Sequence, residues 1–338
     1  MSRKVRPAVA ASEADAPEVR SVWRSLGGAD PTTVEFLRKA SRTKPAMYRL
    51  VFVRPRRPTV YVKRSLISDL ALERTVYQDI LPRLPISAPR YLGSCRDGAG
   101  ATWMFVESVG NRRPADTRPH RVLAAAWLGQ LHRSAADDTL AARLPDGGPA
   151  RYLGHLRAGR EVIRSHFGNF ALTAEDRAVL TRLLAELDGI EARWPEIERA
   201  CADGPVTLVH GDLRAKNVRI RFAGPAAALY VLDWEMAGWG VPAADLTSAF
   251  AQCQTIRFDR RTYLKAVGDR WPELDEAALR RLSTVGRIFQ ALAGIEWSGA
   301  SLRFETQRHL LKPMGSMRVY EGVLVEALAA AREVLRWS

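Results

Sequence analysis

LVHGDLRAKNVRI, residues 208–220, places a carboxylate and an amide in a short loop between two strand-like segments. The apolar run before the loop and the apolar alternation after it are typical of strands. Asp212 and Asn217 stand at the two ends of the loop, and Arg214 and Lys216 add positive charge between them. Loops positioned by strands often carry binding and catalytic residues, so this loop is the first candidate site.

A second segment has the same organisation, ALYVLDWEMAGWGVPAADL at residues 228–246. Its apolar strand ends at Asp233, and the connecting residues 221–227 predict a hairpin that brings Asp233 close to the loop of Asp212. Like charges repel, so neighbouring carboxylates do not by themselves stabilise a fold. They suit Mg²⁺, which binds oxygen ligands from one or two carboxylates together with substrate phosphates.

Glu73 is the third unusual residue, because it falls on the apolar face of a predicted helix at residues 68–85. The apolar residues of that face are Leu70, Val76, Tyr77 and Ile80. A buried carboxylate is costly unless a cation meets it. Lys63, near the end of the preceding predicted strand, is the nearest candidate. We therefore expect a buried Lys63–Glu73 ion pair, an arrangement suited to holding a nucleoside triphosphate.

The pattern along the chain changes from strand-forming to helical near residue 118. Strands are predicted at 34–40, 47–53 and 59–64, a helix with Ser68 as its N-cap at 68–85, and a hairpin at 88–109. Residues 1–20 are expected to form a loose tail. We expect an α+β chain with two domains, residues 1–108 and residues 109–338, and a ligand at their junction.

The composition is that of an ordinary globular protein. Hydrophobic residues make up 47% and charged residues 26% of 338 residues, and no apolar run has the length of a membrane helix. The N-terminal apolar patch is too short for a secretory signal, so we expect a cytoplasmic protein. Three cysteines and six scattered histidines fit neither a disulfide framework nor a zinc site.

The formal net charge of +14 leaves three interpretations open. Arginine supplies most of the excess and is spread along the chain, which favours a solvated basic surface. A pocket for an anionic or phosphorylated ligand is the second interpretation, and a nucleic-acid partner is the third and the least favoured. Electrostatic steering by this charge favours a neutral or anionic small-molecule partner over a polycation.

Taken together, these segments resemble the aminoglycoside phosphotransferase/choline kinase family. The resemblance is carried by His210-Gly211-Asp212 with Asn217, by Asp233-Trp234-Glu235, and by the segment GVPAADL at residues 240–246. Lys63, Glu73 and WLGQLH (127–132) extend it over most of the chain. It implies a two-lobed protein-kinase-like fold, with a small antiparallel β-sheet N-lobe and a large, mainly helical C-lobe.

The resemblance also implies a role for each matching residue. Asp212 is similar to the catalytic aspartate that accepts or orients the acceptor hydroxyl, and Asn217 and Asp233 are similar to the Mg²⁺ ligands. Lys63, held by Glu73, resembles the lysine that contacts the α- and β-phosphates. The backbone from Glu107 to Val109 is expected to bind adenine.

Arg214 has two possible roles. It is either a second catalytic residue, which stabilises charge on the γ-phosphoryl group, or a surface arginine. Lys216 is expected to point to solvent. Structural roles are expected for His132, His210 and Asp245, and positions in the core for Trp271, Trp297 and Trp337.

The family resemblance implies a Mg²⁺-dependent phosphotransferase that moves the γ-phosphate of ATP or GTP to a hydroxyl of a small molecule. The expected acceptor is an antibiotic. A sugar or a choline-like metabolite is the alternative acceptor, and a catalytically inert kinase-like binding protein is the alternative function. No membrane partner is expected.

Overall fold

A computed structural model describes residues 16–40, 45–52, 59–66, 70–223, 226–247 and 257–337. The described residues divide into two compact units. The first contains residues up to 112 together with 219–235, and the second contains 113–218 together with 236–337. This partition differs from the expected domains, because the segment 219–235, with Asp233, belongs to the first unit rather than the second.

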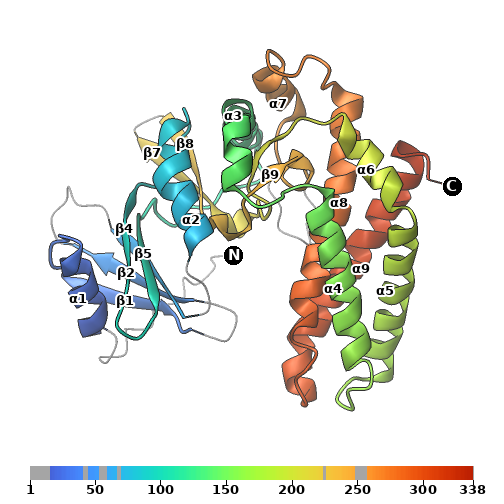
Figure 1. Ribbon diagram of the computed structural model, residues 1–338, viewed down its shortest axis with the longest axis horizontal. Coiled ribbons are helices and arrows are strands. Elements are labelled where there is room, and N and C mark those ends of the chain that lie inside the picture. Colours follow the sequence, from blue (N-terminus) through green and yellow to red (C-terminus); the bar gives the residue numbers. More distant parts are fainter. Residues whose placement is uncertain are drawn as a thin grey trace. The chain divides into compact units, whose positions relative to one another are not determined.

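An antiparallel sheet of five strands in the order β1-β2-β3-β5-β4 forms the centre of the first unit (Figure 1). Its strands are β1 (Thr33–Arg38), β2 (Ala46–Val51), β3 (Val60–Ser65), β4 (Tyr91–Arg96) and β5 (Thr102–Glu107). Successive side chains of a strand point to opposite faces of the sheet. In β2, accordingly, Ala46, Tyr48 and Leu50 are buried and the residues between them are half-buried. The predicted strands and the predicted hairpin are all present, with the hairpin turn at Asp97–Gly100.

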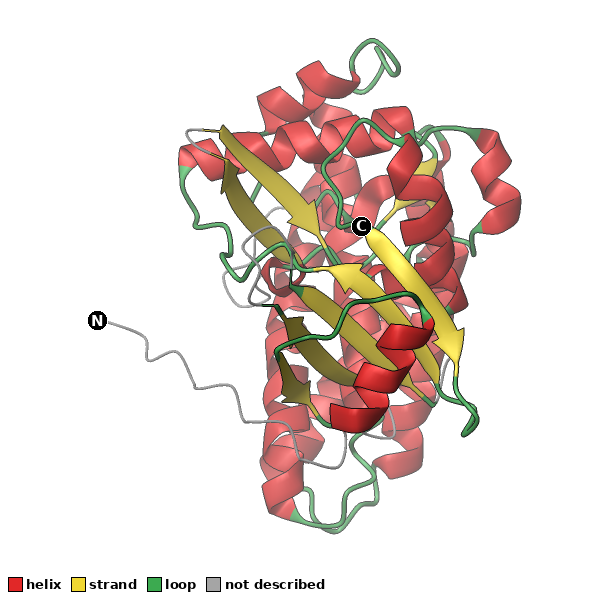
Figure 2. Cartoon of the chain, turned by 90° about the vertical axis from the view of Figure 1, so that its left-hand side faces the viewer, coloured by secondary structure: helices red, strands yellow, loops and turns green. Residues whose placement is uncertain are grey.

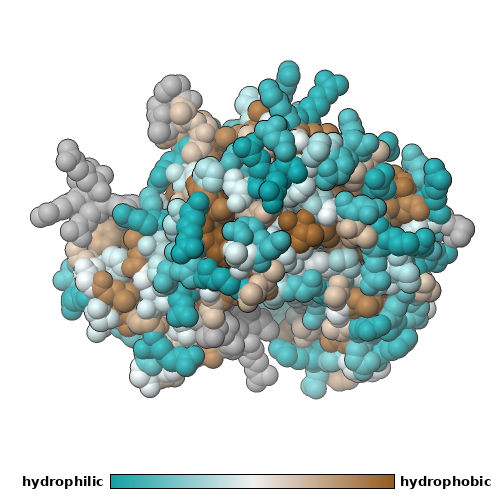
Figure 3. Space-filling view, turned by 45° about the horizontal axis from the view of Figure 1, so that its top comes forward, coloured by the Kyte–Doolittle hydropathy of each residue, from teal (hydrophilic) through white to brown (hydrophobic). Residues whose placement is uncertain are grey.

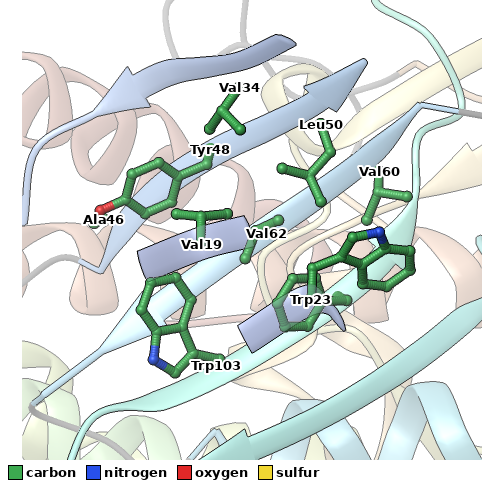
Figure 4. Packing of buried hydrophobic residues seen from close by; sticks show 10 residues of the cluster. Val19, Trp23, Val34, Ala46, Tyr48, Leu50, Val60, Val62 and Trp103 are labelled. Atoms are coloured by element: carbon green, nitrogen blue, oxygen red, sulfur yellow. The ribbon is translucent and has the colours of Figure 1, made fainter. Parts of the chain in front are cut away.

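The helix α1 (Ala16–Ser25) packs on one face of this sheet (Figure 2). Val19 and Trp23 point from the helix into the sheet core, toward Tyr48, Leu50 and Val62 (Figure 4). The Trp23 ring also stacks on Phe105, with 5.2 Å between ring centroids. The expected loose tail is therefore wrong for residues 16–20, because two large apolar side chains one helical turn apart gain more from burial than the segment loses by ordering. Residues 1–15 of that expected tail lie outside the described residues.

The predicted helix at 68–85 is present in three consecutive parts. They are the α-helix α2 (Ala71–Thr75), the π-helix η1 (Val76–Ile80) and the 3₁₀ turn η2 (Leu81–Arg83). Pro82 has no N–H to donate, which fits the end of regular helix at this point. Leu70 precedes the helix, and the expected cap at Ser68 lies outside the described residues.

The second unit is mainly helical. Its helices are α3 (Arg118–Ser134), α4 (Pro149–His166), α5 (Ala174–Ala192), α6 (Trp194–Ala202), α7 (Arg260–Val267), α8 (Glu276–Gly299) and α9 (Gln307–Val334). The helices α4, α5, α8 and α9 pack side by side as a bundle (Figure 1). The central helix of that bundle is α8, which is buried along most of its length.

Four short strands lie within or next to the two sequence segments singled out above, residues 208–220 and 228–246. In the second unit β6 (Thr207–Val209) pairs with β9 (Gly238–Gly240). The hairpin expected from the sequence, β7 (Val218–Ala223) paired with β8 (Ala226–Val231), belongs to the first unit. Short 3₁₀ segments connect the longer elements. They are η3 (Asp138–Arg143), η4 (Ala215–Asn217), η5 (Trp234–Met236) and η6 (Pro242–Ala244). Asp212 and Asp233 thus follow strands β6 and β8, whose hydrogen bonds fix the backbone that precedes each residue.

The surface alternates between polar and apolar side chains. On the face shown in Figure 3, brown apolar patches are small and are separated by teal polar residues. In the described ranges, no helix combines the length and the apolar character that are required to cross a lipid bilayer.

Candidate active site

Lys63 stands at the centre of a charged cluster in the first unit. Its Nζ lies 2.7 Å from each carboxylate oxygen of Glu73, and Glu73 is only 1% exposed. The ion pair expected from the sequence is therefore present. The same ammonium donates to Asp233 Oδ1 at 2.5 Å, a contact that sequence reasoning did not predict. Asp233 follows β8, and nothing in the spacing of residues 63 and 233 signals that they meet.

The two carboxylates determine the charge state of Lys63. Burial by itself would lower the pKa of the lysine, but the carboxylates of Glu73 and Asp233 outweigh burial and raise the pKa above its ordinary value. Lys63 is therefore held in its charged form. Its ammonium offsets the charge of the buried Glu73 carboxylate, which makes the burial of that carboxylate possible.

The backbone of Asp233 has an unusual conformation. Its φ is +69°, in the left-handed region that non-glycine residues seldom adopt. Its N–H donates to the Tyr77 hydroxyl at 3.2 Å, so a side chain of η1 holds the residue in place. Backbone strain of this kind is concentrated at functional sites, which supports Asp233 as a functional residue.

The segment expected to bind adenine follows β5 in the same unit. The N–H groups of Glu107 and Ser108 donate to the carbonyl groups of Arg90 and Thr59, at 2.8 and 2.7 Å. Among the described residues, Val109 N–H donates to no other backbone group. The Glu107 carboxylate meets Arg221 at 2.9 Å. Of the three N–H groups, that of Val109 is consequently the one left for a ligand.

The loop of the second unit is shaped by a glycine. Gly211 has a φ of +77°, and a Cβ at this position would lie 2.4 Å from the Met236 carbonyl oxygen. Only glycine fits such a close approach with this conformation. The turn brings Asp212 and Asn217 together, because Asn217 Nδ2 donates to the Asp212 carbonyl at 3.0 Å and to Oδ2 at 3.2 Å.

Two cations flank the Asp212 carboxylate. Arg214 Nε lies 2.5 Å from Oδ1, and Lys216 Nζ lies 2.8 Å from Oδ2. Lys216 is 47% exposed. The expectation that Lys216 simply points to solvent is wrong, since its ammonium turns back to the carboxylate. Asp212 itself is 5% exposed, so its charge is balanced within the loop.

The Asp245 carboxylate fixes the backbone of the loop that carries Asp212. It accepts the N–H of His210 at 2.6 Å and that of Gly211 at 2.9 Å. His132 Nε2 lies 3.4 Å from the same carboxylate, and its Nδ1 is 3.0 Å from the Tyr263 hydroxyl. The structural roles expected for Asp245 and His132 agree with these contacts. His210 accepts the Asp212 N–H at 3.2 Å, as expected of a residue that stabilises the loop.

Arg214 also contacts two aromatic residues from the helical bundle. Its Nη1 donates to the Tyr320 hydroxyl at 2.9 Å, and its guanidinium lies 5.6 Å from the Trp297 ring centre. Trp297 is 38% exposed, so the expected core position is wrong for this tryptophan. Ile295 is buried, and a residue two positions later on a helix points elsewhere. Trp271 and Trp337 are buried as expected.

Asn217 in the second unit and Asp233 in the first each present an oxygen atom of the kind that a hard cation binds. Asn217 uses its amide nitrogen for Asp212, which leaves the amide oxygen for a metal, and Asp233 supplies a carboxylate that is 29% exposed. Within the described part of the chain there is no cluster of three or more His, Cys, Asp or Glu residues that could bind a metal. Mg²⁺ does not require such a cluster, because water and substrate phosphates complete its coordination.

Comparison with protein families gives one match. The model of the phosphotransferase enzyme family matches residues 24–283, which include every candidate residue described above. A comparison with curated proteins gives no match.

Three solved structures with the same fold are distant in sequence. A spectinomycin phosphotransferase in complex with ADP and spectinomycin is 13% identical, with 94% of this chain and 98% of that chain covered and a TM-score of 0.61. Choline kinase from Cryptosporidium parvum Iowa II is 12% identical, with 95% and 97% covered and a TM-score of 0.61. The GDP complex of an aminoglycoside 2'-phosphotransferase is 13% identical, with 91% and 99% covered and a TM-score of 0.62. The likeness shows a two-lobed, kinase-like α+β fold.

Proposed function

Because this chain belongs to the phosphotransferase enzyme family, we propose that it transfers the γ-phosphoryl group of ATP or GTP to a hydroxyl group of a small molecule. The enzyme class, a small-molecule O-phosphotransferase, follows from the family. The observation that supports a nucleoside triphosphate as the phosphoryl donor is the buried ammonium of Lys63 between Glu73 and Asp233. Such a fixed cation next to a carboxylate suits the phosphates of a nucleotide and the metal that accompanies them.

In the first unit, the proposed roles concern the phosphoryl donor. Lys63 contacts the α- and β-phosphates while Glu73 fixes its position, and the Val109 N–H hydrogen-bonds the base, next to Glu107. Two of the structural relatives carry ADP or GDP, which supports a nucleotide donor. Asp233 in this unit is proposed as a ligand of Mg²⁺, and Asn217 in the second unit is proposed as a Mg²⁺ ligand as well. The metal would supply neutralisation of phosphate charge when bound.

In the second unit, the proposed roles concern the acceptor. Asp212 orients the acceptor hydroxyl and takes its proton as the acceptor oxygen bonds to the γ-phosphorus and the bond to the β-phosphate oxygen breaks. Arg214 contributes positive charge toward the transferred group. Because phosphoryl transfer depends mainly on positioning and on charge neutralisation, these few groups are sufficient for the reaction.

The acceptor is proposed to be a neutral or anionic antibiotic, with a sugar or choline-like metabolite as the alternative. A polycation would need carboxylates that are not already neutralised. Several carboxylates of the helical bundle already have partners: Glu321 pairs with Arg182, Asp176 pairs with Arg318, and Glu296 contacts the His155 ring. The net charge of +14 also disfavours a polycationic acceptor.

The test is a search for a phosphorylated product. Purified protein is incubated with Mg²⁺, ATP or GTP, and separate panels of neutral, anionic and polycationic hydroxylated compounds, and products are examined by mass spectrometry for one added phosphoryl group. Asp212→Asn should reduce product formation about a thousandfold. Asp269→Asn, which changes an exposed aspartate of the same unit, is the matched control and should retain activity.

Three results would each contradict a part of the proposal. Absence of product and of nucleotide binding would support an inert protein, and equal activity in Asp212→Asn would remove Asp212 from the chemistry. Product found only with the polycationic panel would contradict the proposed acceptor class while leaving the phosphotransfer intact.

A further inference from the structure

A glycine in α8 forms a slot for an aromatic ring of α9. A Cβ on Gly294 would lie 2.2 Å from the ζ carbon of Tyr320 and 2.3 Å from a neighbouring ring carbon. The phenol ring therefore lies directly on the backbone of α8, at a distance that any larger residue at position 294 would prevent. Because the ring is half-buried and fixed in this way, its hydroxyl has a defined position.

The hydroxyl of Tyr320 is placed against the catalytic loop. It accepts a hydrogen bond from Arg214 Nη1 at 2.9 Å. On the same guanidinium, Nε lies 2.5 Å from Asp212 Oδ1. The planar guanidinium is thus fixed at two of its edges, one by α9 and one by the Asp212 carboxylate.

Trp297 adds a second aromatic contact to the same guanidinium. The Arg214 guanidinium carbon lies 5.6 Å from the centre of the Trp297 ring and 5.9 Å from that of Tyr320. Both distances fall within the range of cation–π attraction. Arg214 thus contacts Asp212, Tyr320 and Trp297, and its side chain is only 15% exposed, unlike that of a surface arginine.

We propose that Tyr320, seated on Gly294, is a positioning residue for Arg214 and holds the arginine charge at Asp212 for phosphoryl transfer. The inference rests on the proposed function. When the acceptor hydroxyl approaches Asp212, the arginine must turn partly toward the transferred group, and the bond to Tyr320 keeps it within reach. The contact therefore acts on the chemical step and not on the binding of the nucleotide.

The kinetic test is a double-mutant cycle in the full chain. Tyr320→Phe removes only the hydroxyl, and formation of ADP from Mg²⁺–ATP or of GDP from Mg²⁺–GTP is measured in water and with any acceptor found in the panels. We expect kcat to fall about tenfold and the nucleotide KM to stay within about twofold. In an Arg214→Ala background, the same substitution should change kcat by less than about twofold, because Tyr320 acts through Arg214.

A control and a spectroscopic measurement separate positioning from general damage. Tyr91→Phe removes another phenol hydroxyl that forms a hydrogen bond, to Ser94 at 2.7 Å in the first unit, and should leave kcat unchanged. In protein labelled with ¹⁵N-arginine, the Arg214 Nε–H signal is assigned by its absence in Arg214→Lys. This signal should shift and exchange faster with water in Tyr320→Phe, and stay unchanged in Tyr91→Phe.

The proposal is overturned if Tyr320→Phe leaves both kcat and the Arg214 signal unchanged, or if it lowers kcat equally with and without Arg214. If the unmodified protein binds no nucleotide and forms no phosphorylated product, the proposed function fails, and the Arg214 signal alone still decides the positioning. An unchanged signal in Tyr320→Phe then rejects it.

Discussion

Asp245 shows how a single buried carboxylate can order a loop, here the loop that carries Asp212. It is fully enclosed and accepts two backbone N–H groups of that loop, from His210 and Gly211. Burial by itself would raise the pKa of Asp245, but the hydrogen bond and charge of His132, with the N–H of His210, lower the pKa below its ordinary value. The carboxylate is therefore stabilised in its charged form by the groups that it positions.

We predict that Asp245→Asn lowers the free energy of unfolding by about 3 kcal/mol at neutral pH. The amide of asparagine would turn its own N–H groups toward one of the two backbone donors. Since the folded carboxyl has the lower pKa, the advantage of the aspartate is present above about pH 4 and is lost as the pH falls through the folded pKa. Urea unfolding of both proteins across this pH range measures the difference.

The surface variant Asp269→Asn is the comparison for this prediction, and it should change the free energy of unfolding by less than about 0.5 kcal/mol. A stability difference between aspartate and asparagine at position 245 that grew as the pH fell would contradict the assignment.

At the same scale, the sequence predicts some contacts of the site and not others. The Lys63–Glu73 pair is predictable because a carboxylate on an apolar helix face requires a nearby cation. The contact of Lys63 with Asp233 and that of Arg214 with Tyr320 join residues 170 and 106 positions apart. Neither residue type nor local periodicity carries information about such contacts, which depend on how the elements pack.

At the scale of the element, α8 connects the helical bundle to the loop that Asp245 braces. A Cβ at Gly286 would lie 1.8 Å from the backbone oxygen of Ala243 in η6. The helix and the turn therefore touch backbone to backbone. Gln290 of α8 also donates to the Ala244 carbonyl at 2.8 Å, which fixes the turn that precedes Asp245.

We predict that Gly286→Ala destabilises the protein by about 2 kcal/mol and lowers phosphoryl transfer, because η6 must move and Asp245 moves with it. Thermal unfolding and phosphate release measure the two effects. The matched control is Gly189→Ala in α5, where a Cβ meets no atom within 4 Å. This control should raise stability by about 0.5 to 1 kcal/mol, because alanine is the better helix former. Equal effects of the two substitutions would contradict the proposed contact.

Elements were predictable where one residue pattern persists over several turns or strand positions. The strands of the first unit and the helices of the second follow from alternation and from helical periodicity. The helix α1 was missed because its short apolar pattern, Val19 and Trp23, follows a polar and Ala-rich start. The exposure of Trp297 was missed because residue type alone favours burial of tryptophan, whereas its helical phase relative to Ile295 indicates the opposite.

At the scale of the whole molecule, ligand binding should appear as stabilisation. We predict that Mg²⁺ with ADP or GDP, at about one hundred times the dissociation constant, raises the free energy of unfolding by about 2.7 kcal/mol and Tm by about 4 °C. Asp233→Asn should reduce the rise measured with Mg²⁺ present, since it removes a proposed metal ligand and keeps the Lys63–Glu73 pair. Differential scanning fluorimetry with and without a chelator measures both effects.

Asp269→Asn should show the full rise in Tm. A rise that is the same in Asp233→Asn as in the unmodified protein, at every Mg²⁺ concentration, would contradict the role of Asp233 as a metal ligand.

The chain passes between its two compact units three times, after residues 112, 218 and 235. A chimaera made by one splice at residue 112 would therefore take its lysine and glutamate from one parent and the Asp233 that meets the lysine from the other. If Lys63, Glu73 and Asp233 bind the nucleotide as proposed, exchange of nucleotide preference between homologues requires the transplant of residues 219–235 along with the N-terminal segment. Recombination by single crossovers is thus constrained in this protein, whereas a two-segment graft preserves each charge cluster intact.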